Sequence, residues 1–174
     1  MDTAIIRTEK LEDHDKVHAL LVDAFEQRED EARLVERIRR SEGFIPSLSI
    51  VAERDQDIVG HVLISKAKIM NGAEAHEVLA LAPVAVHTDM QKQGIGAALI
   101  KEGLERSRAL GYDLVLLIGH PTYYPRYGFK PARQFGIDLK QYEVPEEVFM
   151  VYELAPGELG KIKGELIYPA PFFE

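Results

Sequence analysis

Residues 81–99 read Leu-Ala-Pro-Val-Ala-Val-His-Thr-Asp-Met-Gln-Lys-Gln-Gly-Ile-Gly-Ala-Ala-Leu, and this stretch decides the fold. An apolar strand runs up to Val86, and a helix follows from Gly94. Gly94 and Gly96 stand where the strand gives way to the helix, and glycine there lets the backbone approach a ligand closely. A helix N-terminus carries roughly half a positive charge and unpaired N–H groups, so the stretch predicts a site for an anion such as pyrophosphate.

Specific residues in and after this stretch exclude two common nucleotide-binding motifs. The dinucleotide fingerprint needs a third glycine three residues after the second, where Leu99 stands. It also needs an acidic residue about 20 positions later, whereas residues 115–118 are Val-Leu-Leu-Ile. A Walker loop is excluded because no Gly-Lys-Ser/Thr follows the glycines. Pro83 lies within the apolar strand and cannot donate a ladder hydrogen bond, which predicts a bulge, an edge or opened pairing there.

The surrounding pattern predicts one α/β domain over residues 1–174. Its hydrophobic periodicities indicate helices over residues 13–25, 29–41 and 94–110, and strands over residues 4–8, 49–54, 58–69, 75–86, 114–119, 136–139 and 148–154. Asn71-Gly72 predicts a hairpin. The strand over 75–86, the crossover helix and the strand over 114–119 form a βαβ unit with parallel strands. We therefore expect a mixed central sheet of about six or seven strands flanked by helices.

Composition limits the classes of function. The net charge is −8, which argues against nucleic acid as the main partner, because phosphate binding relies on an excess of Lys and Arg. No apolar run approaches the roughly 20 residues of a membrane helix, and no secretory signal is visible, so we expect a cytoplasmic protein. The chain has no cysteine, so an acyl-cysteine intermediate is impossible. His14 and His18 have the spacing of a metal pair but no third ligand nearby, and we expect no metal site.

Two segments together resemble a known family. Gln91-Lys92-Gln93-Gly94-Ile95-Gly96 matches the Gln/Arg-x-x-Gly-x-Gly/Ala signature of the GNAT superfamily of N-acetyltransferases. Tyr124-Pro125-Arg126-Tyr127-Gly128-Phe129 matches its later Tyr-x-x-x-Gly-Phe element. The spacing between them and the order of elements resemble that fold over nearly the whole chain. The resemblance implies a single GNAT domain in which the parallel strands on either side of the helix splay apart.

The resemblance also implies a donor substrate and the residues that hold it. The donor is acetyl-CoA or another short acyl-CoA, whose pantetheine arm lies between the splayed strands. Backbone groups of Val84, Ala85 and Val86 would meet the pantetheine amides, as an added strand would. The pyrophosphate would be held by the residues of the signature and the first helical turn: Gln91, Lys92, Gln93, Gly94, Ile95, Gly96, Ala97 and Ala98. Many family members carry an Asn near residue 119, where this chain reads Gly119-His120-Pro121-Thr122.

The implied reaction is direct attack of a primary amine on the thioester within a ternary complex. Tyr124 matches the family position of the acid that protonates the leaving thiolate, and a phenol with a pKa near 10 suits that task. Glu77 and His120 are candidate bases, and a water chain without a dedicated base is an equal alternative. We expect a small-molecule or peptide amine as acceptor, with a homodimer possible. The alternatives are O-acylation and a non-catalytic acyl-CoA sensor on the same fold.

Overall fold

The computed structural model describes residues 4–173, which form two compact units. Of the described residues, the first unit comprises 4–65, 82–106 and 171–173, and the second comprises 66–81 and 107–170. Strands β3 (Asp57–Asn71) and β4 (Glu74–Val86) run from one unit into the other. Over the described residues the strands form one nine-stranded sheet, with the order β1-β2-β3-β4-β5-β8-β6 and with β9 pairing β3 and β7.

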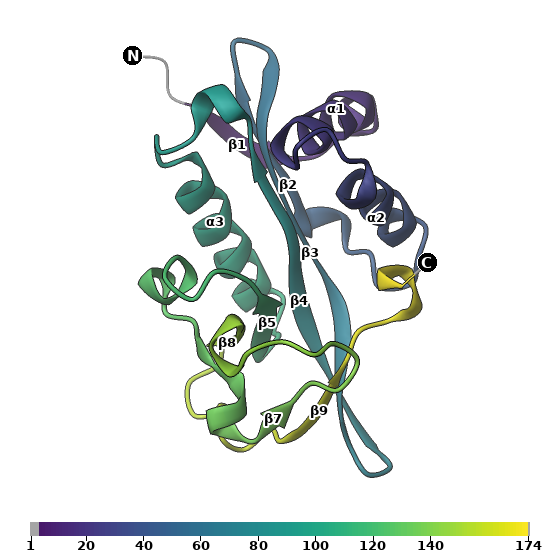
Figure 1. The fold of residues 1–174 in the computed structure, drawn as a ribbon, viewed down its shortest axis with the longest axis vertical. Helices are drawn as coiled ribbons and strands as arrows, with labels where there is room; N and C mark the ends of the chain where they lie inside the picture. Colours follow the sequence, from purple (N-terminus) through teal and green to yellow (C-terminus); the bar gives the residue numbers. More distant parts are fainter. Residues whose placement is uncertain (1–3, 174) are drawn as a thin grey trace. The chain divides into compact units, whose positions relative to one another are not determined.

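The first unit carries helices on both faces of its strands. β1 (Ile5–Thr8) pairs antiparallel with β2 (Ser49–Arg54), and β2 pairs antiparallel with the beginning of β3. Helices α1 (His14–Ala24) and α2 (Asp30–Arg39) cover one face, and α3 (Ile95–Ala109) covers the other (Figure 1). Short 3₁₀ turns complete the unit: η1 (Leu11–Asp13), η2 (Pro46–Leu48) and η3 (Thr88–Met90).

Helix α3 packs against strand β3 over a glycine, Gly60. A Cβ atom on Gly60 would lie 2.8 Å from Cδ1 of Leu99 and 2.9 Å from Cγ2 of Ile95. Real Cβ atoms do not approach neighbours so closely, so the N-terminal turns of α3 occupy the space that a side chain would fill. Gly60 therefore fixes how near the start of α3 comes to the sheet.

The opposite face of the first unit holds an apolar core that also receives the end of the chain. Buried residues of α1, α2, β2, β3 and β4 form one cluster, and Phe172 packs against it. Arg37 on α2 donates from Nε to the carbonyl oxygen of Pro171 at 2.8 Å. The C-terminal residues of the described chain thus dock onto the chain's own core.

A buried polar network lies in the same unit. His61 is fully buried, and its Nε2 lies 3.0 Å from Oγ of Ser49. The Ser49 hydroxyl donates to Oε1 of Glu9 at 2.9 Å, and Arg39 donates to the same carboxylate, which is 2% exposed. Because the single hydroxyl proton of Ser49 goes to Glu9, the network assigns the His61 proton to Nε2. Nδ1 of His61 is then a buried acceptor with no partner among residues 4–173, and burial lowers the pKa of His61 to about 4.

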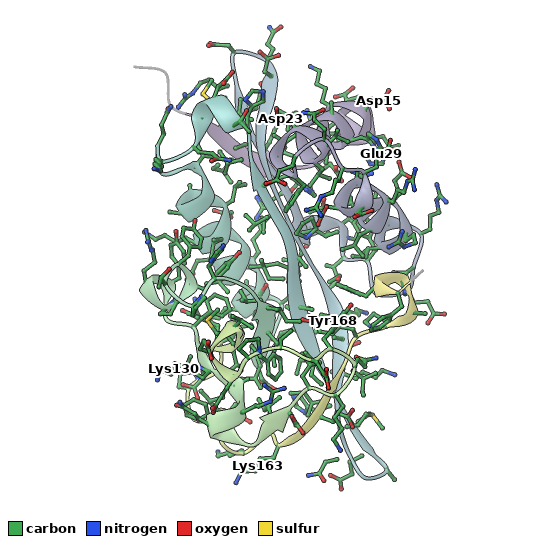
Figure 2. The ribbon with its side chains drawn as sticks, in the orientation of Figure 1. Asp15, Asp23, Glu29, Lys130, Lys163 and Tyr168 are labelled. Carbon is green, nitrogen blue, oxygen red and sulfur yellow. The ribbon has the colours of Figure 1, made fainter. Side chains whose placement is uncertain are left out.

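The second unit is built around strand β5. β5 (Leu114–Ile118) pairs parallel with β4 and antiparallel with β8 (Phe149–Glu153). The short strands β6 (Lys130–Pro131), β7 (Ile137–Asp138) and β9 (Gly164–Ile167) complete it, with the 3₁₀ turns η4 (Tyr124–Tyr127), η5 (Ala132–Phe135) and η6 (Glu146–Val148). The last turn, η7 (Ala170–Phe172), begins at the final residue of this unit and continues into the first. Figure 2 labels Tyr168, which follows β9 and is buried.

The fold class predicted from the sequence is confirmed: a mixed α/β sheet with a parallel pair joined by a crossover helix. The structure has more strands than the expected six or seven, because β6 and β9 were not predicted. The hairpin at Asn71-Gly72 forms, with a positive φ of 62° at Gly72. The expectation of a single domain over residues 1–174 stays a prediction.

Candidate active site

The loop before α3 adopts a backbone suited to an anion. Lys92 and Gly94 both have left-handed φ values, 65° and 86°. A Cβ on Gly94 would have no heavy atom within 4 Å, and residues 91–94 are exposed. The N–H of Ala98 donates to the carbonyl of Gly94 at 3.0 Å, so the N–H groups of the preceding first turn have no acceptor inside the helix. Residues 91–98, called the cradle below, therefore present unpaired donors at an open helix N-terminus.

Arg54, the last residue of β2, lies against the cradle from the sheet. Its Nη1 donates to Oε1 of Gln93 at 3.1 Å and lies 3.2 Å from the sulfur of Met90. Its Nε is buried and has no hydrogen-bond partner among the described residues. Arg54 thus adds a second cation beside Lys92 and holds the loop by a side-chain bond.

A second set of bonds holds the loop to α1. Asp23, labelled in Figure 2, accepts hydrogen bonds from the backbone N–H and the hydroxyl of Thr88, at 3.1 and 3.3 Å. Nδ1 of His87 accepts from the N–H of Asp89 at 3.1 Å, which caps the turn η3. Gln91 donates from its side chain to the carbonyl of Val86 at 3.3 Å. These contacts connect the end of β4 to the cradle with little conformational freedom.

Strand β4 loses its β5 partner before it reaches the cradle. The parallel pairing covers Leu79 with Val115 and Ala80 with Leu116, and no later residue of β4 pairs with β5 in the described chain. This confirms the opened pairing that Pro83 predicted, and the Ala82–Pro83 peptide bond is cis.

The backbone groups of residues 84–86 do not all face the open side. The N–H of His87 donates to Val59 on β3, at 2.8 Å. Because backbone groups alternate along a strand, those of Ala85 also point toward β3, and those of Val84 and Val86 point to the side without a strand. Side-chain donation from Gln91 to the Val86 carbonyl agrees with this alternation. Of the three residues predicted to meet pantetheine, only Val84 and Val86 have backbone groups directed to the open side.

In the second unit, Tyr124 sits in a packed aromatic group. The turn η4 begins after His120, whose carbonyl accepts from the N–H groups of Tyr123 and Tyr124 at 3.2 and 3.4 Å. The Tyr124 ring makes edge contacts with Tyr123 and Phe129, at centroid distances of 5.0 and 5.8 Å. Burial raises the pKa of Tyr124 to about 12. Its hydroxyl makes no hydrogen bond to any described residue, so it is a protonated donor without a protein acceptor.

The two candidate bases lie at opposite ends of β5. Glu77 precedes the pair Leu79–Val115 by two residues, and its carboxylate lies 3.8 Å from Nζ of Lys66 and beside Tyr112, whose pKa it raises together with burial. Tyr124 follows the other end of β5. Because each strand residue advances about 3.3 Å, the five-residue strand keeps Glu77 and Tyr124 apart. His120, by contrast, follows that same end, and its side chain is exposed.

The histidines of α1 lie near carboxylates of the described residues. His18 approaches the carboxylates of Glu36 and Glu29 at 3.3 and 3.6 Å, and Nε2 of His14 lies 3.8 Å from Oε1 of Glu9. Among residues 4–173 no group of three or more metal-ligating side chains converges. In the same range no helix is long and apolar enough to cross a membrane.

Comparison with known proteins identifies the family. The profile of the acetyltransferase (GNAT) domain matches residues 5–132, well over half of the chain. The chain belongs to the GNAT acetyltransferase family. This confirms the resemblance inferred from the signature and from the Tyr-x-x-x-Gly-Phe element, and with it the enzyme class.

Two proteins of Escherichia coli K12 named as uncharacterised N-acetyltransferases are similar in sequence. YhbS is 31% identical over 97% of this chain and 98% of its own length. YjhQ is 37% identical over 67% of this chain, and the match spans 65% of that protein. The crystal structure of the E. coli YhbS protein in complex with CoA has a TM-score of 0.91 at 30% identity, over 100% of this chain and 94% of that one. A Brucella melitensis GNAT acetyltransferase in complex with acetyl-CoA has a TM-score of 0.78 at 28% identity, over 97% of both chains.

Sequence reasoning missed two residues that shape this GNAT site. Arg54 on β2 contacts Gln93 in the cradle, and Asp23 on α1 contacts Thr88 in the turn that precedes it. Neither belongs to the signature, and both lie more than 30 positions from the residues they contact. A lone arginine at the end of a strand and a lone aspartate on a helix carry no local signal for such a contact.

Proposed function

We propose that this chain transfers an acetyl group from acetyl-CoA to a primary amine by direct attack in a ternary complex. The observation that carries the proposal is an exposed helix N-terminus with left-handed Lys92 and Gly94, reached through a strand whose edge is open at Val84 and Val86. The helix N-terminus suits a pyrophosphate, and the open strand edge suits the peptide-like amides of pantetheine. The CoA and acetyl-CoA complexes of similar GNAT proteins support this donor.

The cradle residues have the chemistry to hold such a donor. Backbone N–H groups of the first α3 turn would bind phosphate oxygens, and Lys92 would add a full positive charge. The side chains of Gln91 and Gln93 supply further amides. Val84 has a backbone N–H on the open side, which suits the thioester oxygen, where negative charge develops during attack.

Tyr124 would act as the general acid. As the amine nitrogen bonds to the carbonyl carbon and the carbon–sulfur bond breaks, the Tyr124 hydroxyl gives its proton to the departing sulfur. A pKa raised to about 12 keeps this hydroxyl protonated over the whole working range of pH. We propose that His120 or a chain of water molecules takes the proton of the amine. Glu77 is not included, because its position at the far end of β5 separates it from Tyr124.

The first test is binding. Acetyl-CoA at about 100 times its dissociation constant should add about 2.7 kcal/mol to the free energy of unfolding. For a protein of this size that corresponds to a rise in melting temperature of about 5 to 10 °C. Acetate at the same concentration is the control. No rise with acetyl-CoA would refute the proposal.

The second test is turnover, followed as thiol release with a panel of primary amines. Tyr124→Phe keeps the ring and should lower kcat by about 10²-fold or more while leaving acetyl-CoA binding unchanged. Tyr142→Phe, a hydroxyl removed elsewhere in the same unit, is the matched control. Binding without thiol release from any acceptor would assign the chain as a non-catalytic sensor. A fall in kcat of more than tenfold in His120→Gln would assign His120 as the proton acceptor, and a smaller change would assign water.

A further inference from the structure

Gly119 lies directly beneath the ring of Tyr124. A Cβ atom at Gly119 would lie 2.3 Å from Cε2 and 2.8 Å from Cδ2 of Tyr124. The backbone φ of Gly119 lies outside the left-handed region, so left-handed backbone strain is not what favours glycine here. The absence of a side chain at this position is therefore required by the tyrosine ring and not by the backbone.

Neither partner in this contact has an easy way to move. The N–H of Gly119 donates to the carbonyl of Val148 at 2.9 Å, which holds the glycine to the start of β8. Tyr123 packs edge-on against Tyr124, and Tyr123 in turn accepts a hydrogen bond from the Tyr127 hydroxyl at 2.9 Å and lies under the Arg126 guanidinium at 4.9 Å.

The Tyr124 ring also makes an edge contact with Phe129, which is 2% exposed and packs on Tyr152 at a centroid distance of 5.4 Å. The ring thus lies among a strand end and two aromatic neighbours, while the Tyr124 hydroxyl makes no bond to any described residue. Packing alone, and not a hydrogen bond, sets where the hydroxyl is.

We infer that Gly119 is a positioning residue for the reaction: its missing side chain lets the Tyr124 ring lie against the end of β5, and this places the phenol for proton donation. The inference rests on the proposed role of Tyr124 as the acid.

The size of the expected effect follows from the geometry. Carbon atoms in contact prefer separations of about 3.5 to 4.0 Å, so a methyl group at 2.3 Å forces the ring to move by more than about 1 Å. A misplacement of about 1 Å in a reacting group can lower the rate about 10²-fold. Gly119→Ala should therefore lower kcat by about 10- to 100-fold, with the dissociation constant of acetyl-CoA unchanged.

The test is a double-mutant cycle of Gly119→Ala with Tyr124→Phe. Turnover is measured with acetyl-CoA and an amine from the panel, and binding is measured by titration calorimetry with acetyl-CoA. Because the alanine acts through the tyrosine hydroxyl, it should lower kcat in the wild-type background and change it less than twofold in the Tyr124→Phe background. The ¹³C-labelled tyrosine ring signals of Gly119→Ala should shift, since the ring leaves its edge contacts. Gly103→Ala, which adds a methyl against Ile64 in the first unit, is the overpacking control and should leave kcat unchanged.

The possible results separate the inference from the proposed function. Equal loss of kcat in both backgrounds, or no loss in either, would overturn the positioning role while leaving Tyr124 as the acid. If Tyr124→Phe alone leaves kcat unchanged, the acid and its positioning by Gly119 are both wrong. If Gly119→Ala does not fold, Phe129→Leu replaces it in the cycle. This variant removes the edge contact of Phe129 with the Tyr124 ring and should show the same dependence on the Tyr124 hydroxyl.

Discussion

The approach of α3 to β3 can be tested by adding one methyl group. Gly60→Ala places a Cβ at 2.8 Å from Leu99 and 2.9 Å from Ile95, and at 3.3 Å from Cβ of Ala52. At these separations the Leu99 and Ile95 side chains must shift, and we expect α3, which carries both, to shift with them. Overpacking of this kind costs about 1 to 3 kcal/mol, which a reduced entropy of the unfolded chain offsets by about 0.4 to 1 kcal/mol.

We therefore expect Gly60→Ala to lower the free energy of unfolding by about 1 to 2 kcal/mol, measured from the urea midpoint at constant slope. Because the cradle is the N-terminus of the helix that moves, the affinity for acetyl-CoA should fall as well. Leu99→Val shortens one of the side chains that meets the new methyl group. The double variant should be more stable than the sum of the two single changes predicts, with a coupling energy of at least about 0.5 kcal/mol. Wild-type stability and affinity in Gly60→Ala would refute the idea that this glycine sets the position of α3.

Two further predictions concern Arg54 and His61. Arg54→Met keeps much of the side-chain volume but removes the bond to Gln93, so the dissociation constant of acetyl-CoA should rise by about 5- to 10-fold. At saturating acetyl-CoA, kcat should stay unchanged, and an unaltered dissociation constant would show that the arginine does not support the cradle. For His61, burial depresses the folded-state pKa to about 4, so its contribution to stability is complete above its unfolded pKa, about 6.5, and is lost as pH falls from there toward 4. This loss is on the order of 3 kcal/mol. Urea unfolding of wild type and His61→Gln between pH 7 and 4 should show a steeper decline for wild type, and parallel declines would contradict the assignment.

Much of the fold was predictable from local patterns. The helix over Ile95–Ala109 and the strands that flank it follow from periodicity, and Gly111 closes the helix with a φ of 91° as its position after the last apolar turn indicates. Strand β9 was missed because its four residues, Gly164–Ile167, alternate weakly and are defined by pairing with β3 and β7. Tertiary contacts, and not local propensity, make that segment a strand.

Some features of the candidate site were likewise predictable from local sequence, and others were not. The glycines of the cradle and Tyr124 were found because a helix start and a two-part motif are local in sequence. Which backbone groups of residues 84–86 face the open side depends on the hydrogen bond from His87 to Val59, which the sequence does not show. Glu77 was a reasonable candidate base by residue type, but the register of β4 against β5 separates it from Tyr124. Residue type is visible in a sequence, whereas register and distance arise only from packing.

The open edge of β4 has a consequence for how this protein tolerates substitution. If the donor is held by the main-chain groups of Val84 and Val86, the contact is made by atoms that every residue except proline possesses. Alanine substitutions of Val84 and Val86 would then leave donor binding nearly intact and make an essential segment look dispensable. Proline at residue 86 removes the N–H itself, so it should abolish donor binding where alanine at the same position does not. Because main-chain atoms make the donor contacts, the side chains at this edge can diverge without loss of donor binding. The acceptor specificity can then change while the donor stays the same.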